Sequence, residues 1–194
     1  MDVPSVGALG FRVKSGWAAA ALLRGHREAP ELSFCMRVQL SDPDDPATRQ
    51  PYHARFGTLE TDENVLSARL EAVRRCALAS VDEVLERCAR DGVTLRGVGI
   101  VAGSLADPGR IANEHIRAHA LEGLLFRSVL AERIQESMIP CRFLLERDLW
   151  AEAGRALGIP ESDLKPIVAE LGRGRASPWR ADEKLAATAA WTML

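Results

Sequence analysis

Residues 8–23 read ALGFRVKSGWAAAALL, two apolar runs joined by the short polar link Lys14-Ser15-Gly16. A link that ends in glycine between two such runs predicts a β-hairpin, with strands over residues 6–13 and 17–23. The chain contains no Asp or Glu between Asp2 and Glu28. The predicted hairpin therefore carries no carboxylate.

Hydrophobic periodicity extends the hairpin into an α/β domain. Alternating apolar residues predict a third strand over residues 32–40. A polar loop then continues to Glu60 and is much longer than the usual ~4–6 residues. Apolar residues at helical spacing predict a long helix that begins after an N-cap at Thr61 and ends at Gly92.

The second half of the sequence alternates helices with short apolar runs. These patterns predict strands over residues 93–101 and 141–145, a long helix over 111–139, and further helices over 148–157, 163–171 and 177–194. Pro166 would lie in the first turn of its helix, and Ser177 would cap the last helix with Pro178 at its first position. The predicted order is βββαβαβα.

Composition limits the class of protein. A chain of 194 residues with 47% hydrophobic content is consistent with one domain over residues 1–194. A formal net charge of −2 gives no overall positive field, so nucleic acid or an anionic membrane would need a local basic patch. The longest apolar run, residues 17–23, is too short to span a bilayer and no signal-peptide core is present. We expect a cytoplasmic protein without a membrane partner.

The four cysteines are widely spaced and form no C-x-x-C pair. This spacing is typical of neither a zinc site nor a disulfide framework. Reduced and mostly buried thiols are expected at Cys35, Cys76, Cys88 and Cys141.

Three segments resemble a known family. Gly10-Phe11-Arg12 lies in the first strand, HALEG at residues 119–123 has small residues on one helical face, and ADEKLAATAA at residues 181–190 begins a helix with acids followed by alanines. With the element order, these resemble the ribonuclease H-like fold, and most of all the RuvC-type Holliday-junction resolvases. The resemblance implies a mixed five-stranded sheet with helices on both faces and extra C-terminal helices.

The same comparison predicts a degenerate active site. In that family the first strand carries G-x-D and the fourth strand ends in Glu, but here Arg12 replaces the acid and no acid occurs between Val93 and Ala106. Two-metal hydrolysis needs several converging carboxylates, and a guanidinium cannot donate a lone pair to a cation. Asp182 and Glu183 remain, and two acids at a helix start are typical of favourable charge near the positive end of the helix dipole.

One helical stripe carries candidate metal ligands. His115, His119 and Glu122 share a face because positions i, i+4 and i+7 align. Zinc normally takes three or four protein ligands, and the spacing supplies no further His or Cys. Semi-buried structural histidines are therefore the favoured interpretation, and a metal site is the alternative.

Two basic clusters with aromatic residues could bind an anion. The first, in the long loop, contains Arg49, Tyr52, His53 and Arg55, and the second contains Arg173, Arg175 and Trp179 before a helix N-terminus. Ordinary solvent-exposed arginines around packing aromatics are the favoured interpretation of both clusters, and anion binding is the alternative. The rule that ligands lie beyond the carboxyl ends of strands predicts Ser15, Ser104 and Glu146 at one edge of the sheet. Lys14 and Ser104 would join the two clusters there in one anion-binding rim.

Two functions follow from these patterns. The first is a non-catalytic or re-purposed domain that binds an anionic ligand, nucleotide or protein partner without a cofactor. The second is a metal-dependent phosphoesterase or nuclease with unconventional ligands drawn from the histidines and from Asp107, Glu146, Asp182 and Glu183. The missing strand acids favour the first, nucleic acid is a less favoured ligand, and a homo-oligomer is left open. An actin-like ATPase is disfavoured because it needs two such domains.

Overall fold

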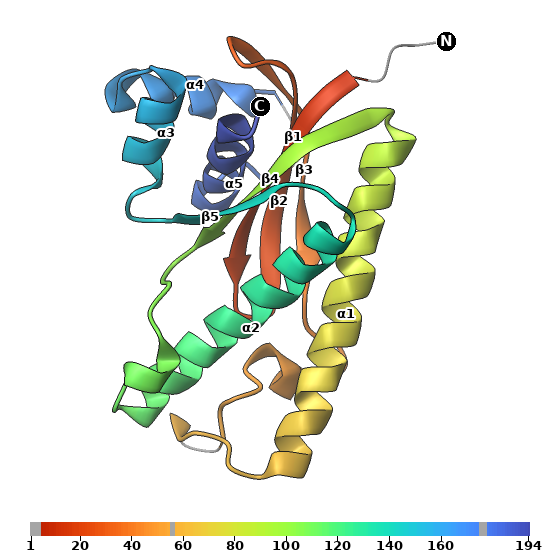
Figure 1. The fold of residues 1–194 in the computed structure, drawn as a ribbon, viewed down its shortest axis with the longest axis vertical. Coiled ribbons are helices and arrows are strands. Elements are labelled where there is room, and N and C mark those ends of the chain that lie inside the picture. The colour runs from red at the N-terminus through yellow and green to blue at the C-terminus, as the bar shows by residue number, and fades with distance from the viewer. Residues whose placement is uncertain (1–4, 55–56, 175–177) are drawn as a thin grey trace.

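A computed structural model describes residues 5–54, 57–174 and 178–194. Its five strands form one sheet in the order β3-β2-β1-β4-β5 (Figure 1). β1 pairs antiparallel with β2 and parallel with β4, β2 pairs antiparallel with β3, and β4 pairs parallel with β5. The strands are β1 (Ser5–Lys14), β2 (Trp17–His26), β3 (Ala29–Gln39), β4 (Val93–Ala102) and β5 (Cys141–Leu145). The predicted mixed five-stranded sheet is confirmed.

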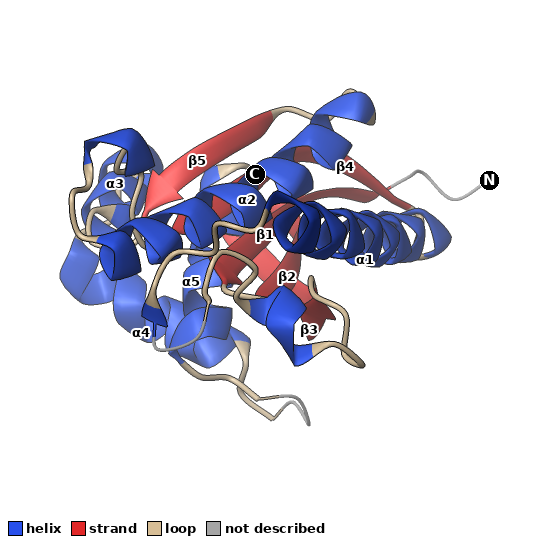
Figure 2. Ribbon diagram, turned by 90° about the horizontal axis from the view of Figure 1, so that it is seen from below, coloured by secondary structure: helices blue, strands red, loops and turns tan. Residues whose placement is uncertain are grey.

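Helices cover both faces of the sheet (Figures 1 and 2). The two long helices pack side by side on one face, where Phe11 and Phe126 contribute to the larger apolar core. The shorter C-terminal helices pack on the other face, where Ala8, Ala21 and Trp191 are buried. The helices are α1 (Glu63–Arg90), α2 (Glu114–Glu136), α3 (Leu149–Leu157), α4 (Glu161–Leu171) and α5 (Ala181–Thr192), with 3-10 turns η1 (Pro46–Arg49) and η3 (Pro108–Arg110).

Glycines allow α5 to lie directly on the middle of the sheet. A Cβ atom at Gly10 would collide with the carbonyl oxygen of Ala186, and one at Gly99 would come within 2.7 Å of the carbonyl oxygen of Ala189. The alanines of α5 present small side chains to β1, β2 and β4, so backbone meets backbone at van der Waals distance. This close contact positions the start of α5 beside the end of β1.

Several predicted helix ends are wrong because side chains cap elsewhere. Asp62 rather than Thr61 caps α1, accepting hydrogen bonds from the backbone of Asn64 and Val65. Asn113 caps α2, so the helix begins three residues after the predicted start. α5 begins at Ala181, where the Glu183 carboxylate accepts from the backbone N–H of Arg180 at 2.9 Å.

The predicted positions of two prolines also change. α4 begins at Glu161, so Pro166 lies in the second turn instead of the first and cannot donate a backbone hydrogen bond there. Pro178 lies outside α5, while the predicted cap Ser177 falls outside the described residues. Within the described part of the chain, no helix is both long and apolar enough to cross a membrane.

Candidate anion cavity and histidine cluster

Arg12 lies at the centre of the end of the sheet. It is on β1 between Ala19 of β2 and Val101 of β4, and only 4% of it is exposed. Its Nη2 atom donates to the Glu146 carboxylate, which follows β5, and its Nε atom lies 3.8 Å from Asp182 Oδ1 at the start of α5. Lys14 Nζ lies 3.3 Å from the same Asp182 oxygen. Two carboxylates and two cations therefore neutralise one another.

This arrangement does not fit a pair of hard divalent cations. A magnesium site needs oxygen atoms that converge on open space, but the guanidinium of Arg12 lies between the two carboxylates. Gly103 borders Arg12 and Glu146 where β4 ends and supplies no side-chain ligand. Glu183 caps α5, and Asp107 caps η3 while pairing with Arg110 at 3.6 Å.

A cavity of about 270 Å³ opens beside this centre. Three elements line it: the end of β1, the segment after β4, and the middle of α2. Its polar lining residues are Arg12, Lys14, Ser15, Ser104, His119 and Arg127. The structure thus places Lys14, Ser15 and Ser104 in one lining, and Glu146 contacts Arg12 beside it.

Arg127 is the one cation in this lining that sequence reasoning missed. It is on α2, only 7% exposed, and its Nη1 atom donates to the carbonyl oxygen of Ser104 at 3.2 Å. Among the described residues, no Asp or Glu forms an ion pair with it. Burial lowers the pKa of Arg127, as expected for a charge removed from water without a carboxylate partner.

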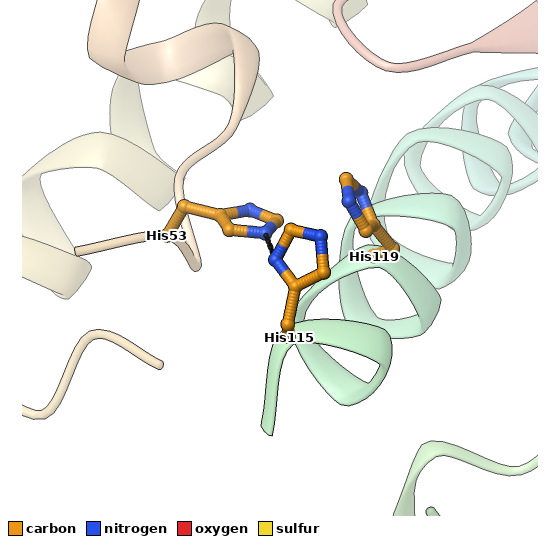
Figure 3. Close-up of side chains that lie close together, drawn as sticks. All are labelled: His53, His115 and His119. Atoms are coloured by element: carbon orange, nitrogen blue, oxygen red, sulfur yellow. Dashed lines mark hydrogen bonds between the residues drawn. The ribbon is translucent and has the colours of Figure 1, made fainter. Parts of the chain in front are cut away.

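A second cluster lies next to the cavity. His53 from the loop after β3 meets His115 and His119 of α2, and one ligand nitrogen from each lies within 4.8 Å of the others (Figure 3). His53 Nε2 and His115 Nδ1 are 3.2 Å apart. The ring centroids of the three imidazoles are separated by 4.5 to 5.1 Å.

Glu122 contacts two of these histidines from the buried side of the cluster. It is fully buried on α2, with Oε1 at 2.7 Å from His53 Nδ1 and Oε2 at 3.4 Å from His119 Nδ1. Burial raises the pKa of Glu122, and the hydrogen bond from His53 opposes that rise. The expectation of semi-buried histidines on α2 is wrong, since His115 and His119 are exposed. The sequence predicted this stripe but not the third imidazole.

The loop that carries His53 is held by side chains. Arg69 on α1 donates to the carbonyl oxygens of Pro51 at 3.2 Å and His53 at 3.1 Å, and pairs with Glu60 at 3.2 Å. Buried Thr48 accepts from the backbone N–H of Asp42 at 2.9 Å. These contacts fix the loop between the first turns of α1 and α2 (Figure 1). Tyr52 lies in the same loop. Its pKa is raised mainly by burial and to a smaller extent by the negative charge of Glu122.

The remaining predicted arginines lie elsewhere. Arg49 is exposed beside Gly16 in the β1–β2 turn, where it does not line the cavity. Arg173 pairs with Glu170 at 2.7 Å, and Trp179 donates to the carbonyl oxygens of Val168 and Ala169 at 3.1 Å each. Trp179 thereby links the segment before α5 to α4 on the opposite face of the sheet, whereas the pair of Arg173 with Glu170 is local to the end of α4. Arg55 and Arg175 lie outside the described residues.

Comparisons with known proteins agree with this architecture. RuvC from Thermus thermophilus in complex with a Holliday-junction substrate matches with a TM-score of 0.57 at 15% identity, over 98% of this chain and 92% of that chain. A second Thermus thermophilus RuvC structure gives 0.54 at 15% identity, over 97% and 92%. The fold is ribonuclease H-like. The predicted RuvC-type layout is confirmed, and an identity this low establishes the fold alone.

The other comparisons give no match by sequence and a weaker match by structure. Neither a protein-family model nor a curated protein matches this chain. A Ppx/GppA-family protein from Aquifex aeolicus matches more weakly, with a TM-score of 0.40 at 11% identity over 79% of this chain and 40% of that chain.

Proposed function

We propose that this ribonuclease H-like domain binds a phosphate group of nucleic acid in the cavity beside Arg12 and does not hydrolyse it by a two-metal mechanism. The observation that carries the proposal is Arg127. A buried guanidinium without a carboxylate partner is costly, and an anion in the cavity would offset that cost.

The cavity has the donors that a phosphate needs. Arg127 and Lys14 are cationic, and the hydroxyl of Ser104 accepts from the backbone N–H of Ala106 at 3.0 Å, which leaves its own proton available to donate. Hydrogen bonds from charged donors to phosphate contribute about 1.5–3 kcal/mol each. Two or three such bonds suit a single phosphate better than a large organic ligand, given the cavity of about 270 Å³.

Nucleic acid is the preferred source of this phosphate for two reasons. The RuvC structure of the same fold is in complex with a Holliday-junction substrate. The cavity lies at the end of the sheet where ligands of open α/β sheets bind. The cavity offers only a few cationic donors and so would neutralise few phosphates, which predicts a shallow slope of log affinity against log salt.

The proposed absence of two-metal hydrolysis is supported by the contacts of Arg12 and Lys14. Arg12 and Lys14 hold the charges of Glu146 and Asp182, so neither carboxylate is free to share a pair of magnesium ions. The domain would therefore recognise a phosphodiester without cutting it through that centre.

The test compares two arginines of the same helix. Arg127→Met removes the unpaired guanidinium, whereas Arg133→Met removes an arginine that pairs with Asp82 away from the cavity. We expect the wild type and Arg133→Met to bind fluorescent single-stranded, duplex and four-way DNA, and Arg127→Met to bind about tenfold or more weakly. A thermal-shift assay with inorganic phosphate and mononucleotides tests whether the cavity binds a free phosphate compound instead of nucleic acid.

The stability of Arg127→Met separates binding from folding. Because replacing a buried charge by an apolar side chain is often neutral or stabilising, the melting temperature without ligand should stay equal or rise. Weakened binding in a variant that is at least as stable supports the proposal. Equal binding by wild type and Arg127→Met, or no response to any phosphate compound, contradicts it.

A further inference from the structure

We propose that His53, His115 and His119 bind one divalent transition-metal ion of the zinc class, with Glu122 orienting the imidazoles. This inference goes beyond phosphate binding and does not rest on it. The site combines one residue of the long loop with two residues of α2, as Figure 3 shows.

The distances between the nitrogen atoms suit such an ion. Zinc binds imidazole nitrogen at about 2.0–2.1 Å in tetrahedral geometry, so two ligand nitrogens on one ion lie about 3.3 Å apart. His53 Nε2 and His115 Nδ1 are already 3.2 Å apart, and all three candidate nitrogens lie within 4.8 Å. A tetrahedral ion would keep one further position for water or for the carbonyl oxygen of Gly57, which lies 3.2 Å from His115 Nδ1.

Glu122 is an independent observation in favour of a metal. Histidines that bind metals commonly donate their other ring N–H to a carboxylate, which fixes the tautomer. His53 Nδ1 is hydrogen-bonded to Glu122 at 2.7 Å, so its Nε2 is directed toward the other two rings. The second Glu122 oxygen is buried, has no hydrogen-bond partner among the described residues, and lies 3.4 Å from His119 Nδ1. A metal on His119 Nε2 would hold the Nδ1 proton toward that oxygen.

The ligand set also limits the class of metal. Neutral imidazoles suit zinc, copper, nickel and iron, whereas magnesium and calcium prefer oxygen. The loop contacts of Arg69 hold His53 in place before an ion binds, which reduces the ordering cost of binding.

The full chain offers a matched control for the experiment. It has four histidines, and the fourth, His26, lies on β2 outside the cluster. We would first remove metal with a chelator and then titrate zinc against a chromophoric chelator, with native mass spectrometry for stoichiometry. The expected result is one zinc per chain for the wild type and for His26→Ala, and no such binding for His115→Ala. Glu122→Gln should bind zinc about 10–100-fold more weakly.

Cobalt provides a second readout that a structural role would not change. Cobalt bound to the wild type should show the visible absorption of a four-coordinate ion, and His115→Ala should not. Circular dichroism checks that this exposed-residue variant still folds. A wild type that binds zinc no more tightly than His115→Ala, or a loss of binding in His26→Ala as well, overturns the proposal. DNA binding measured in the presence of chelator tests the phosphate proposal separately.

Discussion

Arg12 places a positive charge between two carboxylates at the end of the sheet. Its guanidinium is almost fully buried and contacts the carboxylates of Glu146 and Asp182. The positive charge of Arg12 therefore offsets the negative charges of these two carboxylates. In the proposed function, this guanidinium occupies the place between the two acids that a divalent cation would need.

The variant Arg12→Asp should make the stability of the protein depend on a bound divalent metal ion. It would place three carboxylates together, so their repulsion should lower the melting temperature, and magnesium should restore it at millimolar concentration. The wild type and Arg12→Met should show no magnesium-dependent shift. Magnesium is chosen because it binds imidazoles weakly and so does not report on the histidine cluster. Equal stabilisation of wild type and Arg12→Asp by magnesium would contradict this account of Arg12.

Two cysteines give a pH dependence with a defined sign. Burial raises the pKa of the Cys88 and Cys141 thiols from 9.0 to about 11. A raised pKa in the folded state means that the folded protein favours the protonated thiol. The stability from this preference is complete below pH 9 and is lost as the pH rises toward 11, by about 2–3 kcal/mol for fully buried Cys88. Denaturant unfolding of the wild type and Cys88→Ala should show a smaller loss over this range in the variant.

The residues that the sequence did not reveal are those whose role depends on distant partners. Arg127 shares a helical stripe with Ala120 and Gly123, and a charge on that inward stripe was the available signal. His53 belonged to a loop cluster expected to bind an anion, and no spacing rule connects residue 53 with residue 115. Only the packing of the loop against α2 joins them.

Among the helices, α5 depends most on glycines of the sheet, which have no side chain and so let the helix backbone lie close to the strands. Gly10→Ala would drive a methyl group into the backbone of Ala186 and should displace α5, at a cost of about 3 kcal/mol or more. Gly123→Ala makes the same chemical change inside α2, where the new Cβ meets only Arg127 Nη1 at 3.5 Å, and should stabilise by about 0.5–1 kcal/mol. Equilibrium urea unfolding measures both. Similar effects of the two substitutions would show that the contact between α5 and the sheet is less tight than described.

Periodicity predicted β3 and the long helices because each buries one face, whereas β1, β2 and β4 form apolar runs in the sequence because they are buried on both faces. The alternation in residues 32–40 and the helical spacing before Gly92 correspond to β3 and α1. The ends were less predictable because single hydrogen bonds decide them. Thr61 and Asp62 are both good caps, and the choice of Asp62 follows from its bonds to Asn64 and Val65. The start of α5 similarly depends on Glu183.

At the scale of the whole molecule, α2 contributes residues to both proposed sites. His119 lines the phosphate cavity and belongs to the histidine cluster, while Arg127 lies two turns further along the same helix. An ion on the histidines would add positive charge beside the cavity. The sites can therefore assist each other, although each has its own test.

The most direct measurement is a four-way DNA junction incubated with the protein and magnesium, followed by native and denaturing gels from the same reaction. We predict a retarded junction in the native gel and intact strands in the denaturing gel, and Arg127→Met should need about tenfold or more protein to retard the junction equally. Magnesium-dependent strand cleavage by the wild type that is abolished by Asp182→Asn would contradict it, because that result requires a working carboxylate centre where Arg12 now lies.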